Sequence, residues 1–182
     1  MNYIEILKRL LGDTIERLFL IMCSDGIEDI DVKLGLVMNK MPNQLIVIGT
    51  DLSDWESPAV TLEELPTRCL QEEDFYKNIE KRISIESDEE MWFSYEYEYY
   101  DFSNSNSFKD VITRKISNIQ FFGWNRYEFS PFGIKLIFKS DFILSLSHTN
   151  GNTIETKNFN INRKFEIRQN FREIIYTNIN SL

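Results

Sequence analysis

The chain has 182 residues and a mass of 21.7 kDa, with 42% hydrophobic, 27% charged and 14% aromatic residues. A globular chain of this size buries roughly 70% of its unfolded surface, so the composition predicts one domain over residues 1–182 and excludes intrinsic disorder. The formal net charge of −9 argues against a nucleic-acid partner, because phosphates are bound by basic surfaces.

The N-terminal part predicts a short helix followed by three antiparallel strands. Apolar residues spaced three and four apart predict a helix over residues 3–11 that ends at Gly12. Strands are predicted over 15–22, 32–38 and 45–48, with turns at 24–26 and 41–43. The uninterrupted apolar run from Leu18 to Met22 predicts that the first strand is covered on both faces.

The same pattern recurs about a hundred residues later, with strands predicted near 116–122, 133–138 and 142–146. We interpret residues 14–55 and 115–155 as an internal repeat, joined by the acidic segment 56–107. The alternative is that any two three-stranded meanders resemble each other at this level of detail. Both interpretations predict an α+β fold, mainly antiparallel sheet built from two similar three-stranded meanders, with a few short helices.

The remaining segments predict shorter elements. Thr61 followed three residues later by Glu64 is a capping-box spacing, which predicts a helix over 62–70. Helical spacing over 74–82 passes into a strand at 83–85, and strict alternation predicts another strand over 91–102. An exposed loop is expected at 103–107, a hairpin turn at Asn150 and Gly151, and a strand and a closing helix after residue 153.

The N-terminus and the cysteines indicate the compartment. Residues 1–11 mix Glu5, Lys8 and Arg9 with apolar residues, unlike the charged-then-apolar order of a signal peptide. No apolar run approaches the roughly 18 residues of a membrane span, so we expect a cytoplasmic protein without a membrane partner. Cys23 and Cys69 follow no metal-binding or redox spacing and are expected to be buried thiols.

Catalytic motifs are missing from the sequence. The only histidine, His148, lies in a predicted turn where nothing orients it as a general base. Cys23 would need His148 beside it to act as a nucleophile, and their positions in the two meanders do not predict this. Glycine-rich phosphate-binding motifs do not occur either. These observations favour a protein without catalytic residues, cofactor or metal ion, and they leave an enzyme as the less expected class.

Four carboxylates lie close together in the first predicted hairpin. Asp25, Glu28, Asp29 and Asp31 fall within seven residues, a density that could chelate a hard cation such as calcium. Their spacing does not match the EF-hand loop, which ends in a glutamate at its twelfth position. We interpret the segment as the acidic tip of a hairpin with no metal ion.

Negative charge is concentrated in the first part of the chain. Residues 1–107 carry a net charge of −14 and residues 108–182 carry +5, while residues 51–101 hold 16 acidic against 4 basic side chains. Such a surface either keeps the protein soluble or attracts a basic partner.

The predicted strand over 91–102 has an outward side that joins aromatic and acidic residues. Trp and Tyr supply contact area at interfaces, and carboxylates beside them select Arg and Lys. The residues predicted to bind a partner are Glu89, Glu90, Trp92, Glu96, Glu98, Tyr100 and Asp101. The alternative is an edge strand whose charges prevent aggregation.

With this acidic and aromatic face over residues 88–101, the small acidic chain resembles the immunity proteins of bacterial polymorphic-toxin and contact-dependent inhibition systems. The resemblance implies a protein that binds a basic nuclease toxin and blocks its active site, and it assigns no individual site residue. Two alternatives stay open. One is a small-molecule- or metal-binding module, or a hydrolase, that uses a cleft between the two meanders. The other is a structural subunit that forms homo-oligomers through its aromatic residues.

Overall fold

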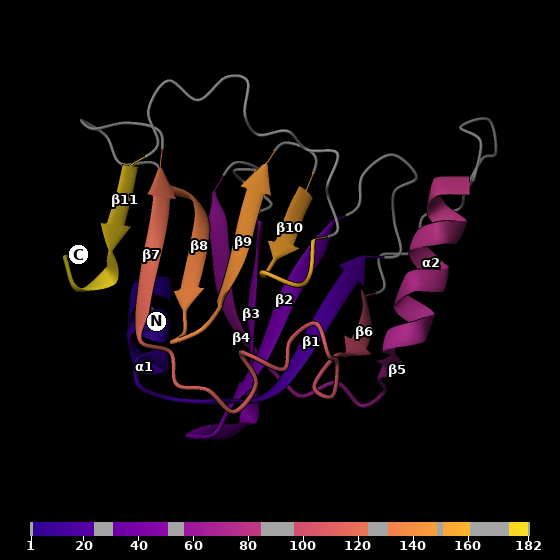
Figure 1. The fold of residues 1–182 in the computed structure, drawn as a ribbon, viewed down its shortest axis with the longest axis horizontal. Helices are drawn as coiled ribbons and strands as arrows, with labels where there is room; N and C mark the ends of the chain where they lie inside the picture. Colours follow the sequence, from indigo (N-terminus) through magenta and orange to yellow (C-terminus); the bar gives the residue numbers. More distant parts are fainter. Residues whose placement is uncertain are drawn as a thin grey trace.

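The computed structural model describes residues 2–23, 31–50, 57–84, 97–123, 131–148, 151–160 and 175–181, which form two stacked β-sheets and a few short helices (Figure 1). The first sheet has the strand order β4-β3-β2-β1-β6-β5, with β1 (Ile15–Cys23), β2 (Val32–Met38), β3 (Met41–Thr50), β4 (Pro58–Glu63), β5 (Leu70–Gln71) and β6 (Tyr97–Asp101). The second sheet has the order β10-β9-β8-β7-β11, with β7 (Asn118–Gly123), β8 (Pro131–Ile137), β9 (Phe142–His148), β10 (Gly151–Glu155) and β11 (Ile175–Asn178). The helices are α1 (Tyr3–Leu10), α2 (Glu72–Ser84) and the short 3-10 helix η1 (Ile179–Ser181).

The two sheets share one connectivity, which confirms the α+β class with mainly antiparallel strands. In the first sheet, each strand from β1 to β4 forms an antiparallel hairpin with the next strand along the chain. The strands from β7 to β10 do the same in the second sheet. A later strand then pairs antiparallel with the first strand of each set, β6 with β1 and β11 with β7. Each predicted three-stranded meander is thus extended on both sides. The internal repeat and the single-domain organisation stay predictions.

The inner faces of the two sheets pack against each other and share one hydrophobic core. Because side chains alternate along a strand, Leu18, Leu20 and Met22 of β1 face this core, whereas Phe19 and Ile21 face outward. All five side chains are at most 2% exposed. The predicted coverage of this strand on both faces is confirmed.

Residues 64–69 cover the outer face of the first sheet. The helix predicted over 62–70 is wrong, since Leu62 ends up in β4 and residues 64–69 are not helical. Instead Leu65 and Cys69 pack on the outward cluster that includes Phe19. The topology explains this outcome, because the segment runs from one edge strand, β4, to the other, β5. Strands lie roughly 4.8 Å apart and an extended chain advances about 3.3 Å per residue, against about 1.5 Å for a helix, which would be too short.

The two α-helices of the described chain close opposite sides of the sandwich (Figure 1). From α1, Ile6, Leu7 and Leu10 enter the shared core. From α2, the fully buried Phe75 joins a cluster of aromatic rings, most of them edge-to-face, that reaches the segment after β10 at Phe159. The other rings of this cluster are Tyr76, Tyr100, Phe102, Phe108 and Phe159. Neither described helix is long and apolar enough to cross a membrane.

Two predicted connections differ in the structure: one turn is displaced and one loop is partly buried. The turn expected at 41–43 lies instead at Asn39 and Lys40, because the Lys40 amide donates to the buried Asp13 carboxylate at 3.1 Å and the Asn39 amide donates to the Thr14 carbonyl at 3.0 Å. In the loop predicted to be exposed, Ser105 is only 5% exposed.

The elements predicted around residues 83–85 and after residue 153 also differ. Helix α2 continues through Ser84, so no strand begins at Ile83, and residue 85 lies outside the described residues. Ile175, expected in a closing helix, lies in β11, because its segment pairs with β7. Residues 161–174 lie outside the described residues. The antiparallel pairing of β9 with β10 bears out a hairpin here, but Gly151 is not a turn residue, since it lies in β10 opposite His148, and Asn150 lies outside the described residues.

Gly12 ends α1 as predicted and has φ +73° with no atom within 4 Å of an added Cβ. We expect Gly12→Ala to lower the free energy of unfolding by about 1 kcal/mol through backbone strain alone, and Gly12→Asn to lower it less. Urea denaturation of the three proteins measures the difference. Equal stability of the alanine variant and the wild type would contradict this account.

Candidate functional site

Strand β6 carries the only predicted partner-binding residues that lie within the described part of the chain. Its faces are the reverse of those expected. Tyr97 is 40% exposed and Tyr99 packs on the outer cluster of the first sheet, whereas Tyr100 is fully buried in the shared core. The prediction that Tyr100 offers an exposed contact surface is therefore wrong. Side chains alternate between the two faces of β6 as predicted, but α2 covers the face that was expected to be in contact with solvent.

Glu98, Tyr100 and Asn78 form a hydrogen-bonded triangle between β6 and α2. The Tyr100 hydroxyl donates to the Glu98 carboxylate at 2.5 Å, and the Asn78 amide donates to the same carboxylate at 3.1 Å. Asn78 also donates to the Tyr100 hydroxyl. Glu98 thus serves the docking of α2 on the sheet, so its replacement by lysine would disturb the fold together with any surface.

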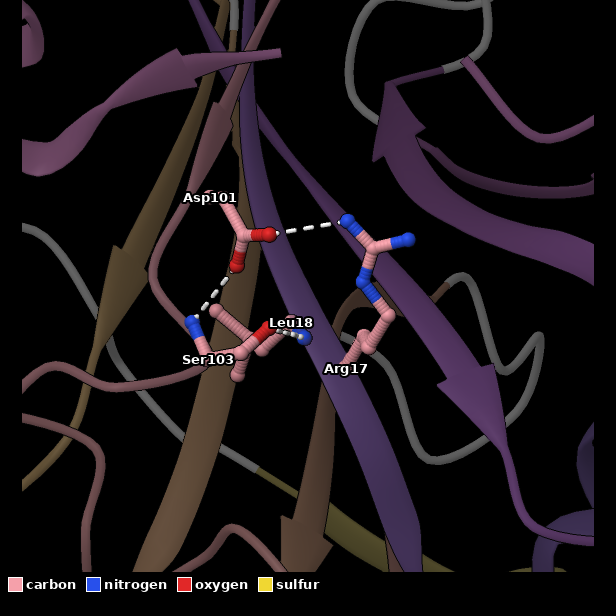
Figure 2. Close-up of polar contacts among 4 residues, drawn as sticks. All are labelled: Arg17, Leu18, Asp101 and Ser103. Atoms are coloured by element: carbon pink, nitrogen blue, oxygen red, sulfur yellow. Dashed lines mark hydrogen bonds and ion pairs between the residues drawn. The ribbon is translucent and has the colours of Figure 1, made fainter. Parts of the chain in front are cut away.

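Asp101 forms the best-defined charged contact of the described chain (Figure 2). Its carboxylate accepts from the Arg17 guanidinium at 2.8 Å and from the Ser103 amide at 2.9 Å, while the Ser103 hydroxyl accepts from the Leu18 amide at 3.0 Å. Burial disfavours the ionised form of Asp101, but hydrogen bonds from Ser103 and Arg17 and the Arg17 charge outweigh it and lower the pKa of Asp101. This site holds the end of β6 against β1.

Cys69 lies beside the same guanidinium. Burial raises the pKa of the Cys69 thiol above its ordinary value, and the nearby Arg17 only partly offsets this. A thiol that is held protonated is a poor nucleophile. The expectation of a buried thiol is met in part, because Cys69 is half-buried. The side chains of Cys23 and His148 lie outside the described set.

Four predicted partner-binding residues, Glu89, Glu90, Trp92 and Glu96, lie outside the described residues. Asp25, Glu28 and Asp29 of the acidic hairpin also lie outside them. Asp31 is described, and one of its carboxylate oxygens accepts from the Asn152 amide of the second sheet at 2.7 Å. Among the described residues, no three His, Cys, Asp or Glu side chains are close enough to hold a metal ion.

A buried polar cluster joins the two sheets at one end, and the sequence interpretation missed it. Inward positions of β9 change from Ile143 to Ser145 and Ser147, which are at most 3% exposed, and Asn152 beside them in β10 is fully buried. The two serines interrupt an otherwise apolar inward pattern, a signal that could have revealed the cluster. Apolar residues make up most of the remaining contact between the described sheets.

Comparisons of the chain with protein-family models, with curated proteins and with solved structures find no match.

Because the folded state lowers the pKa of Asp101, its ionised contacts stabilise the protein above the ordinary pKa of about 3.9, and this contribution is lost as the pH falls through the lowered pKa. We expect Asp101→Asn to lower the free energy of unfolding by about 0.5–1 kcal/mol at pH 7, a modest effect because Arg17 is partly exposed. Denaturation at pH 7 and pH 3 measures it. The two proteins should converge at the lower pH, and a difference that grows with acidification would contradict the sign.

Proposed function

We propose that this protein is a non-enzymatic binding domain that neutralises a basic protein partner, as bacterial immunity proteins do. The observation that supports this proposal best is the gathering of acidic connections at one end of the first sheet. The described partner-face residues Glu98, Tyr100 and Asp101 are engaged within the chain. The binding role therefore rests on the surface around them and on Glu89, Glu90, Trp92 and Glu96.

Antiparallel pairing brings six element ends to the same end of the first sheet. The end of β1 meets the start of β2 at Met22 and Val32, and the end of β3 meets the start of β4. The start of β6 lies beside Cys23, and α2 runs toward this end (Figure 1). The segments that connect these ends are residues 24–30, 51–56 and 85–96. We call these described strand ends, to which the three connections attach, the acidic end.

The sequences of the three connections contain eleven acidic side chains and no Lys or Arg in 25 residues. At the opposite end of the first sheet, the turn with Lys40 and the segment 64–69 carry one acidic and two basic residues. Antiparallel pairing thus attaches the most acidic connections to the same end of the first sheet. A field of one sign accelerates association with a basic partner and excludes acidic ones.

An exposed tyrosine borders the acidic end. Tyr97, at the start of β6, is 40% exposed, and its hydroxyl accepts from the Lys33 ammonium at 2.7 Å. Tyrosines of this kind supply contact area in protein interfaces. The acidic end therefore combines charge for steering with at least one aromatic contact residue.

Affinity capture from a lysate of the source organism, at low and high salt, tests the proposal. We expect the wild type to retain one basic protein, identified by mass spectrometry, and to lose it at high salt because charge attraction is screened. Replacing Glu89, Glu90 and Glu96 by lysine should weaken its capture at low salt by at least about tenfold.

The matched control replaces Glu5, Glu16 and Glu64, exposed glutamates elsewhere on the chain, by lysine. It changes the net charge by the same amount, so it should retain the partner with nearly wild-type yield. Circular dichroism verifies that both triple variants fold. Capture that is insensitive to the first variant, or equally weakened by the control, would remove the acidic end from the interface.

A further inference from the structure

Asn152 of the second sheet forms hydrogen bonds with residues of the first sheet. Its side chain is fully buried between the sheets, where the surrounding inward positions are mostly apolar. A polar group in such a place destabilises the fold unless it is hydrogen-bonded. Asn152 meets this requirement with hydrogen bonds to β9, to β2 and to Asp31, which precedes β2.

The hydrogen bonds of Asn152 converge on the start of β2. Its backbone amide donates to the Asp31 carboxylate at 2.7 Å, and its side-chain amide donates to the Val32 carbonyl at 2.7 Å. Its side-chain oxygen accepts from the Ser145 hydroxyl at 3.0 Å. Val32, the first residue of β2, and Asp31 directly before it are therefore both held by one residue of the second sheet. We call Asp31, Val32 and Asn152 the clasp.

A longer contact continues the clasp to β3. The Ser147 hydroxyl lies 3.4 Å from the Gly49 carbonyl and 3.5 Å from the Asn152 side-chain oxygen. Gly49 is next to Thr50, the last residue of β3, and Thr50 is buried with no hydrogen-bond partner for its hydroxyl. The second sheet thus contacts the first at two of the strand ends that border the acidic end.

We propose that Asp31 is a positioning residue for the acidic end, which acts through its hydrogen bond to Asn152 and not through its charge. This inference rests on the proposed function. The geometry supports it because one Asp31 oxygen is already engaged by a buried amide, and because Asp31 directly precedes β2. Held in this way, the start of β2 keeps one position relative to the second sheet, and a binding surface with a fixed border loses less entropy when a partner binds.

Two substitutions at one position separate the bond from the charge. Asp31→Asn removes the charge but keeps a side-chain oxygen that can accept from the Asn152 amide, whereas Asp31→Ala removes both. Amide hydrogen exchange, measured on the protein without any partner, reports whether the hydrogen bonds of the clasp are intact. We expect the amides of residues 32–34 and 152–154 to exchange at least about threefold faster in Asp31→Ala. They should keep nearly wild-type rates in Asp31→Asn, and residues 119–121 of β7 serve as the internal control for global unfolding.

Affinity for the basic protein recovered by capture provides the second measurement. We expect Asp31→Ala to weaken binding at least about threefold, with Asp31→Asn close to the wild type. Equal weakening by both substitutions, without a change in exchange, would show that Asp31 acts by charge and would overturn the positioning role. Ser147→Ala, which removes only the longer contacts, offers a milder variant if Asp31→Ala does not fold, and it should accelerate exchange at residues 152–154.

The failure of this inference and the failure of the proposed function are distinguishable. If the lysine variant of Glu89, Glu90 and Glu96 binds like the wild type, the acidic end is not the interface, whatever the exchange rates show. If that variant loses the partner while Asp31→Ala exchanges and binds like the wild type, only the clasp is refuted.

Discussion

The contact between the inner faces of the two sheets is the interaction on which the rest of the structure depends. Each sheet alone would leave an apolar face in water, at a cost of about 25 cal/mol for every Å² exposed. Together the faces bury one core, to which Leu20 of β1 and Phe121 of β7 both belong. The helices then close the open sides, with Leu7 from α1 and Phe75 from α2 entering the same core.

The packing of the shared core also determines which parts of the chain are left to form a binding surface. Consecutive hairpins place alternate connections of the first sheet at opposite ends, so the chain can put acidic residues into every second connection and keep the others nearly neutral. The strands themselves contribute few free charges to this arrangement. Where carboxylates occur at the sheet, as with Asp101 and Glu98, they are bonded to Arg17 or to Asn78 and hold elements together.

Comparison of predicted and observed elements shows where local pattern suffices. The helix before Gly12 and the strands of both meanders follow from apolar spacing, because each buries a continuous stripe or face. The helix predicted over 62–70 is wrong because the capping signal is local. The extended path of residues 64–69 is instead imposed by the distance between β4 and β5. The predicted exposure of Tyr100 on β6 is also wrong. Both sides of that strand carry aromatic and polar residues, so only the packing of α2 determines which side is covered.

By itself, the sequence determined the α+β class, the strands of the two meanders and the concentration of acidic residues in the first part of the chain, because periodicity and composition are local properties. The tertiary structure alone decided that the strand ends flanking the acidic connections lie at one end of the first sheet, that Tyr100 is buried, and that Asn152 bonds to Asp31 across the sheets. These features join residues far apart in the chain. The pairing of strands and the packing of two faces determine which distant residues meet, and no local spacing encodes that choice.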